Sequence, residues 1–154
     1  MMLLVVFQLN GQLYGLDGVL AERVVPLVSL RPVPHAPEYV SGIFNLQGRI
    51  VPVIDMCRLI AGRPSREALS TRIIVVSFPC ADGRTRLLGL MAETVLEARA
   101  VEPDLLEAPV LHTSGAPYLG PVLKDPAGLI QIVELPRLIP EDLQQRLFAG
   151  DGET

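Results

Sequence analysis

Apolar residues in this chain form short runs separated by turn residues, a pattern that is typical of β-strands. The first two runs, residues 3–9 and 12–16, flank the pair Asn10-Gly11. Because Asn and Gly tolerate a positive φ, this pair predicts a two-residue type I′ turn and therefore a β-hairpin. Residues 73–91 repeat the arrangement around Asp82-Gly83 and predict a second hairpin of the same kind.

A second repeated pattern follows each predicted hairpin. Residues 50–60 align without a gap on residues 129–139, and Asp55 falls opposite Glu134. Each segment predicts an apolar strand that ends at a carboxylate, which we expect to accept backbone N–H bonds at the start of a short helical turn. We infer an internal duplication whose halves meet near residues 61–70. Its period exceeds that of stacked solenoid repeats and indicates two related sub-barrels.

The remaining segments fit this plan. Residues 18–28 predict a strand with one face on the core. Prolines interrupt residues 31–37, which are expected to form a loop, and residues 110–117 are the matching irregular stretch of the second half. Residues 140–148 predict a closing helix, with a proline in its first turn and acidic residues near its N-terminus. Residues 149–154 are expected to be a flexible tail.

The composition narrows the class of protein. Hydrophobic residues make up 49% of the chain and charged residues 19%, which disfavours disorder. No apolar run approaches the roughly 20 residues of a membrane span, and residues 1–7 lack the features of a signal peptide. The net charge of −4 and the lack of basic clusters disfavour a nucleic-acid surface. We therefore expect a cytoplasmic protein with one domain over residues 1–148, whose halves span about 1–62 and 71–139, and with protein partners.

The sequence contains no motif that supports catalysis. His35 and His112 lie near prolines in different halves, and neither has a second ligand at the spacing of a metal or nucleophile site. Cys57 is expected to be a buried small hydrophobe. It and Cys80 are expected to be reduced thiols, although a single disulfide between them stays open. We predict no enzymatic activity, no catalytic residue, no metal and no cofactor.

The most specific motif lies in residues 39–59, which include Val40-Ser-Gly-Ile-Phe-Asn-Leu-Gln-Gly-Arg-Ile-Val-Pro-Val-Ile-Asp-Met56. This stretch closely resembles the signature of the CheW family, the coupling proteins of bacterial chemosensory arrays, and the resemblance extends over nearly the whole chain. It implies an all-β fold of two small SH3-like five-stranded β-barrels that exchange strands, with a shared core, a groove between the barrels and short helices at the ends of the halves.

The resemblance also implies a function. Members of the family are non-catalytic adaptors that bind the regulatory domain of a CheA-type histidine kinase, which is itself CheW-like, and the hairpin tip of a methyl-accepting chemoreceptor. The implied location is the cytoplasm, at membrane-associated receptor arrays, and self-association in such arrays is left open. The receptor, the kinase and the signal are not identified by the sequence.

Residue positions carried over from the family predict two sets of contacts. The receptor-binding set is Ala21, Leu30, Gly42, Gln47 and Gly48, and the kinase-binding set is Arg23, Arg31 and Arg72. Gln47 replaces the arginine usual in the family, Arg23 stands where a glutamate is common, and Arg72 replaces a small aliphatic residue. Because charge at an interface governs partner choice, these departures suggest a partner set of its own, for example in a non-flagellar pathway. Gly42→Arg is expected to keep the fold and abolish receptor binding.

Two other classes of function stay open at this point. The chain could be a stand-alone β-barrel that binds a peptide or small ligand without a kinase partner. An enzyme on a barrel scaffold would require a closed cavity in which polar groups with shifted pKa values converge.

Overall fold

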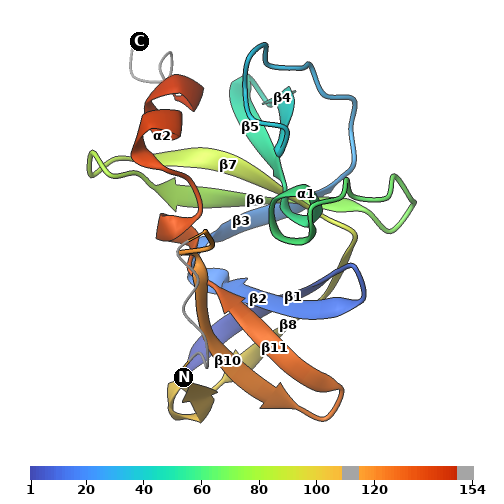
Figure 1. The fold of residues 1–154 in the computed structure, drawn as a ribbon, viewed down its shortest axis with the longest axis vertical. Coiled ribbons are helices and arrows are strands. Elements are labelled where there is room, and N and C mark those ends of the chain that lie inside the picture. Colours follow the sequence, from blue (N-terminus) through green and yellow to red (C-terminus); the bar gives the residue numbers. More distant parts are fainter. Residues whose placement is uncertain (109–114, 149–154) are drawn as a thin grey trace.

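The computed structural model describes residues 1–108 and 115–148, whose strands form two sheets. The five-stranded sheet has the order β3-β6-β7-β5-β4, and the six-stranded sheet has the order β8-β1-β2-β11-β10-β9 (Figure 1). The strands are β1 (Met2–Leu9), β2 (Gln12–Asp17), β3 (Ala21–Pro26), β4 (Val40–Leu46), β5 (Arg49–Asp55), β6 (Arg72–Pro79), β7 (Thr85–Ala92), β8 (Thr94–Val101), β9 (Leu106–Glu107), β10 (Leu119–Asp125) and β11 (Gly128–Val133). The sixth strand of the larger sheet is the two-residue β9. The predicted fold class is confirmed.

The two halves of the chain exchange hairpins. The β1–β2 hairpin of the first half belongs to the six-stranded sheet, and the β6–β7 hairpin of the second half belongs to the five-stranded sheet. Both insertions use the same parallel pairing, in which Ile132 of β11 lies opposite Gly15 and Val53 of β5 lies opposite Gly89. Val53 and Ile132 are also aligned in the sequence repeat, and so are the two glycines. The structure thus confirms the internal duplication.

In each sheet, one continuous segment of the chain runs from the strand at one edge of the sheet to the strand at the other edge. In the six-stranded sheet, β8 leads through the 3-10 helix η2 (Pro103–Leu105) into β9, at the opposite end of the order. In the five-stranded sheet, the segment after β3 reaches Arg31, which pairs with Ile43 of β4. The Arg31 N–H donates to the Ile43 carbonyl at 2.9 Å, and the Ile43 N–H donates to the Arg31 carbonyl at 2.8 Å. Each half therefore wraps its sheet in the same way.

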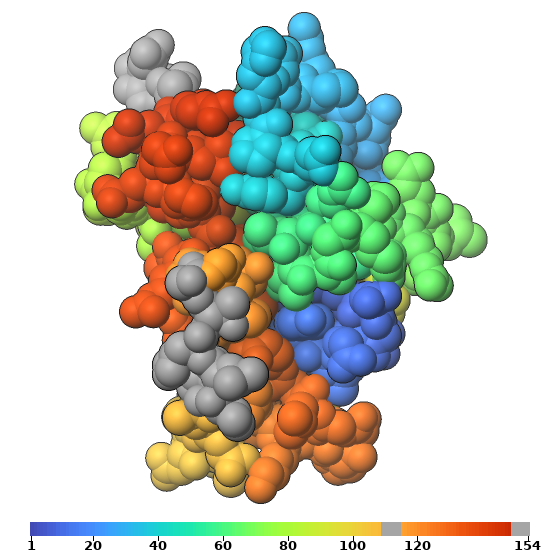
Figure 2. All heavy atoms as spheres, in the orientation of Figure 1, coloured from blue at the N-terminus to red at the C-terminus, as the bar shows by residue number. Residues whose placement is uncertain are grey.

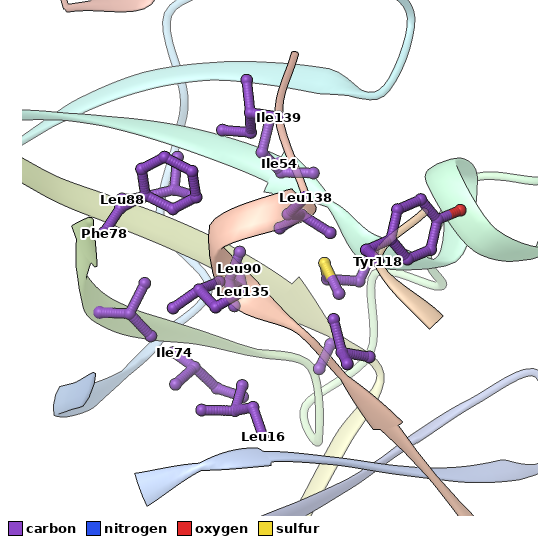
Figure 3. Packing of buried hydrophobic residues seen from close by; sticks show 14 of the residues in the cluster. Leu16, Ile54, Ile74, Phe78, Leu88, Leu90, Tyr118, Leu135, Leu138 and Ile139 are labelled. Carbon is purple, nitrogen blue, oxygen red and sulfur yellow. The ribbon is translucent and has the colours of Figure 1, made fainter. Parts of the chain in front are cut away.

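Strands β1 and β6 are buried on both faces, which explains their uninterrupted apolar sequences. In β1, Leu4 and Val6 pack inside the six-stranded sheet, whereas Val5 and Phe7 face a large cluster between the two sheets. β6 alternates in the same way. The shared cluster contains residues from both halves (Figure 3), among them Leu16, Ile54, Ile74, Phe78, Leu88, Leu90, Tyr118, Leu135, Leu138 and Ile139. Each such large side chain contributes about 1.5 to 3 kcal/mol when fully buried.

The β1–β2 turn has the predicted form, and the β4–β5 turn shares it. Asn10 and Gly11 have φ values of 52° and 76°, and Gln47 and Gly48 have 51° and 91°, so both pairs are two-residue turns with positive φ. The prediction for the β6–β7 turn is wrong in detail. β6 ends at Pro79 and β7 begins at Thr85, and of the loop residues between them only Gly83 has a positive φ. The longer loop relaxes the need for an Asp-Gly type I′ turn.

The remaining elements largely agree with the predictions. The strand expected in residues 18–28 is shorter, because the 3-10 helix η1 (Gly18–Leu20) precedes β3, and this edge strand is mostly exposed instead of having one face fully on the core. Short helices do end the halves: α1 (Met56–Ala61) in the first, and η3 (Leu135–Arg137) followed by α2 (Glu141–Leu147) in the second. The predictions for residues 110–114 and for the tail lie outside the described residues.

Among residues 1–108 and 115–148, no helix has the length and apolar character needed to cross a bilayer.

Candidate interaction surfaces

All eight residues predicted to contact a receptor or a kinase belong to the five-stranded sheet or its connections. Arg23 and Ala21 lie on β3, Leu30 and Arg31 lie between β3 and β4, and Arg72 begins β6. Gly42 lies within β4, and Gln47 and Gly48 form the turn to β5. The structure therefore gathers both predicted sets on one sheet and interleaves them.

Gly42 is buried, and the backbone of Arg31 lies directly against it. Its φ is +145°, and an added Cβ atom would be 2.5 Å from the Arg31 carbonyl oxygen. A side chain at this position would break the pairing of Arg31 with β4. This geometry opposes the expectation that Gly42→Arg keeps the fold. A receptor contact at Gly42 stays a prediction, but that substitution cannot test it.

Gln47 and Arg23 line one depression of about 150 Å³, although they were predicted to contact different partners. The turn that carries Gln47 is fixed by the Asn45 side chain, which accepts the Gly48 N–H at 2.7 Å. Arg49, at the start of β5, also lines this depression and was missed by sequence reasoning. The sequence signal that could have identified Arg49 is its position directly after the Gln47-Gly48 turn. The guanidinium groups of Arg23 and Arg49 make no hydrogen bond or ion pair within the described part of the chain.

Arg72 and Leu30 have different surroundings from Gln47. The Arg72 guanidinium is half-buried and donates to the carbonyls of Leu69 and Thr71, the latter at 3.0 Å. Leu30 is half-buried and lines a cavity of about 520 Å³ near the end of β5. Backbone carbonyls thus already hold the Arg72 side chain, whereas Arg23 and Arg31 are exposed.

An exposed apolar rim borders the shared cluster, and sequence reasoning missed it. Val24 of β3 is 46% exposed and pairs with Ile74, whose side chain belongs to the shared cluster. Leu3 of β1 is 48% exposed and lies on the same strand face as Val5, another member of that cluster. Val19 is also exposed and follows Gly18, which packs against Leu3. Contiguous exposed apolar patches are typical of protein interaction sites, and Leu3, Val19 and Val24 are the candidates for such a patch here.

Glu93, which lies between β7 and β8, also links the two halves of the chain. One carboxylate oxygen accepts the Asn10 N–H at 2.8 Å and Arg63 Nη2 at 3.0 Å; the other accepts the Arg66 N–H at 2.9 Å and Arg63 Nη1 at 3.1 Å. The side chain is 13% exposed. Its hydrogen bonds from Arg63, followed by those from the backbone, lower the pKa of Glu93 to about 2.

This carboxylate joins three separate parts of the chain: the β1–β2 turn, the segment between the halves and the β7–β8 connection. Figure 2 shows the green residues of α1 and the segment after it lying against the blue β1–β2 hairpin. Arg63 adds a further bond, from Nε to Asn10 Oδ1 at 3.0 Å. The arrangement fixes the relative position of the two sheets.

The two duplicated carboxylates have different roles. Asp55 accepts the N–H groups of Cys57 and Arg58 at 3.1 and 3.2 Å and caps α1, as predicted. The same prediction is wrong for Glu134, whose side chain makes no capping bond to η3. The physical reason is that Cys57 corresponds to Pro136, which has no N–H to donate.

The candidate chemistry gives no catalytic arrangement in the described residues. Cys57 and Cys80 are both buried and neither is in a disulfide, so the bond that was left open does not form. Burial, followed by the nearby Glu93 charge, raises the pKa of the Cys57 thiol, which disfavours a reactive thiolate. Within residues 1–108 and 115–148, no three His, Cys, Asp or Glu side chains gather as metal ligands. His35 is exposed, and His112 lies outside the described residues.

Comparisons with known proteins agree with the duplicated two-sheet fold. The chain is 27% identical over 146 residues to the "Chemotaxis protein CheW" of Treponema pallidum (strain Nichols), covering 94% of this chain and 85% of that protein. It is 25% identical over 141 residues to the "Chemotaxis protein CheW" of Rhizobium meliloti (strain 1021), covering 90% and 88%.

A solved structure is similar as well. The crystal structure of the scaffolding protein TtCheW from Thermoanaerobacter tengcongensis matches with a TM-score of 0.78 and 31% identity, over 90% of this chain and 88% of that one. The CheW-like domain family matches residues 3–143. The chain therefore belongs to the CheW-like family.

Proposed function

We propose that this protein is a non-catalytic adaptor that couples the cytoplasmic tip of a chemoreceptor to a CheA-type histidine kinase in a bacterial chemosensory array. The named relatives support a role in chemotaxis. The observation that carries the proposal is the apolar rim formed by Leu3, Val19 and Val24, because these side chains border the shared cluster without completing it.

A receptor tip docks on this rim as a helical hairpin. Helices bind such surfaces through apolar side chains spaced three and four residues apart, and the rim offers apolar partners on both β1 and β3. Ala21 lies on the same face of β3 as Val24, since both pair with residues of the shared cluster. Gln47 and Gly48 at the β4–β5 turn, together with Leu30 and Gly42, which lie next to each other, complete the proposed receptor surface on the five-stranded sheet.

The kinase regulatory domain binds through the arginines of the same sheet. Arg23 and Arg31 are exposed. Arg72, the first residue of β6, pairs with Pro26 at the end of β3. Charges of this kind select partners and speed their association more than they add affinity. The departures at Gln47, Arg23 and Arg72 support a partner set of its own, as in a non-flagellar pathway. Individual contacts are of moderate area and gain strength from multivalent assembly at a membrane-associated array in the cytoplasm.

Co-purification with a kinase regulatory domain, with and without a receptor fragment, tests the proposal. Val24→Glu places a charge in the rim and is expected to weaken receptor-fragment binding at least tenfold, with the kinase domain still bound. The matched control is Leu129→Glu on β11, because Leu129 is 60% exposed and outside the rim. Circular dichroism checks that both variants fold. Failure of the native chain to bind either partner would favour a stand-alone barrel that binds a peptide or small ligand.

A further inference from the structure

In each sheet one strand, here called the closing strand, leads directly into a helical segment: β5 leads into α1, and β11 leads into η3. A cavity lies beside each of these junctions. The cavity next to Asp55 has a volume of about 520 Å³, and the cavity next to Glu134 has a volume of about 410 Å³. Met91 lines the first and Asp17 lines the second, and each of these residues follows, by two positions, the glycine that faces the closing strand. The cavities therefore occupy corresponding places in the duplication.

At the first cavity the chain supplies its own covering segment. Pro64 and Ser65, from the connection between the halves, form part of the wall. The Ser65 backbone N–H donates to the Asp55 carboxylate at 2.9 Å, and the Ser65 hydroxyl donates to the same carboxylate at 2.5 Å. As a result, Asp55 is only 6% exposed. A Pro-Ser segment without regular secondary structure thus packs against this end of the first half.

The second cavity has no corresponding cover in the described residues. Glu134 makes no capping bond, lies back over Gly120 and forms an ion pair with Arg137 at 3.4 Å. Its side chain is 39% exposed, so carboxylate lone pairs remain accessible to further donors. The other lining residues are mainly apolar, namely Met2, Leu20, Pro121, Ile132, Leu135 and Pro136.

We propose that this second cavity binds an extended segment of another protein in which a proline is followed by a serine. The segment binds as Pro64 and Ser65 do in the first half: its serine N–H and hydroxyl donate to the Glu134 carboxylate, and its proline ring packs on the apolar lining. The volume lies within the range of about 300 to 1,000 Å³ that is usual for ligand sites. The cavity neighbours the proposed receptor rim, because its lining residues Met2 and Leu20 are adjacent in the chain to Leu3 and Val19, but the proposal does not depend on receptor or kinase binding.

The internal segment supplies the probe. A fluorescent peptide with the sequence of residues 62–69, Gly-Arg-Pro-Ser-Arg-Glu-Ala-Leu, is titrated against the full chain by anisotropy. Saturable binding is expected, and Glu134→Gln and a Ser65→Ala peptide should each weaken it at least fivefold. Glu107→Gln changes another exposed acid of the same sheet, in the edge strand β9, and should leave binding unchanged. Absence of saturable binding, or equal weakening by Glu107→Gln, would overturn the proposal.

Backbone amide chemical shifts locate the peptide. Changes at residues 17–20 and 134–137 would support the proposed site. Changes confined to residues 55–65 would mean that the peptide displaces the chain's own segment at Asp55, and this outcome would overturn the proposal as well.

Discussion

The two sheets place opposite charges at corresponding positions. Arg23 pairs with Val75 on the five-stranded sheet, and Glu97 pairs with Val6 on the six-stranded sheet; these two valines lie opposite the corresponding glycines of β7 and β2. Likewise, Arg31 pairs with Ile43 of β4, and Glu107 pairs with Val122 of β10. The fold accepts either sign at these positions, so the charges are not needed to form it.

The local environment of these charges also differs. Glu97 is bonded to Arg99 at 2.7 Å, and Glu107 forms an ion pair with Lys124 at 3.6 Å. The side chains of Arg23 and Arg31 have no hydrogen bond or ion pair among residues 1–108 and 115–148. Charges that are already paired within the chain gain less from a partner than unpaired charges do. The comparison therefore supports the proposal that charged partners bind the five-stranded sheet.

The largest expected effect separates the two duplicated carboxylates. Asp55→Ala removes the cap of α1 and the bonds to Ser65, so we expect the free energy of unfolding to fall by about 3 kcal/mol. Glu134→Ala removes an exposed ion pair and should cost no more than about 1 kcal/mol. Urea unfolding of both variants measures the difference. Equal losses would show that Glu134 has a structural role that its contacts do not explain.

An effect of similar size concerns the junction at Glu93. Its pKa falls from 4.5 to about 2 on folding, so its contribution to stability is fully present above pH 4.5 and is lost as the pH falls from 4.5 toward 2. The shift corresponds to about 3 kcal/mol. Glu93→Gln should lower stability at pH 7 and flatten the pH dependence in this window. Thermal unfolding between pH 2.5 and pH 7 measures both effects, with the exposed Glu67→Gln as a control. A native-like pH dependence in Glu93→Gln would assign the loss to other carboxylates.

The sequence carried most of the fold because its signals were local. Asn10-Gly11 specified one turn through positive φ, and the repeat of residues 50–60 specified the duplication together with the cap at Asp55. The same pattern was misleading at Glu134, because Pro136, which corresponds to Cys57, has no N–H to donate.

The candidate surface was less accessible to sequence reasoning. The apolar rim depends on strand pairing, since nothing local distinguishes the exposed Val24 from the half-buried Val25. Gly42 shows the same limit: its packing against Arg31 comes from a contact eleven positions away in the chain and could not be seen in the motif itself. Motifs identified the residues, whereas only the pairing of strands showed which of them face solvent.

The smallest expected effect tests the charge comparison directly. Arg23→Glu reverses an unpaired charge and should weaken binding of the kinase regulatory domain about fivefold, equivalent to about 1 kcal/mol, with a larger loss at low salt than at high salt. Glu97→Arg makes the opposite change at the corresponding position of the six-stranded sheet and should leave kinase binding unchanged. Isothermal titration at two salt concentrations compares them. If Glu97→Arg changes the affinity as much as Arg23→Glu does but in the opposite direction, net charge alone governs the interaction, and the five-stranded sheet has no special role in it.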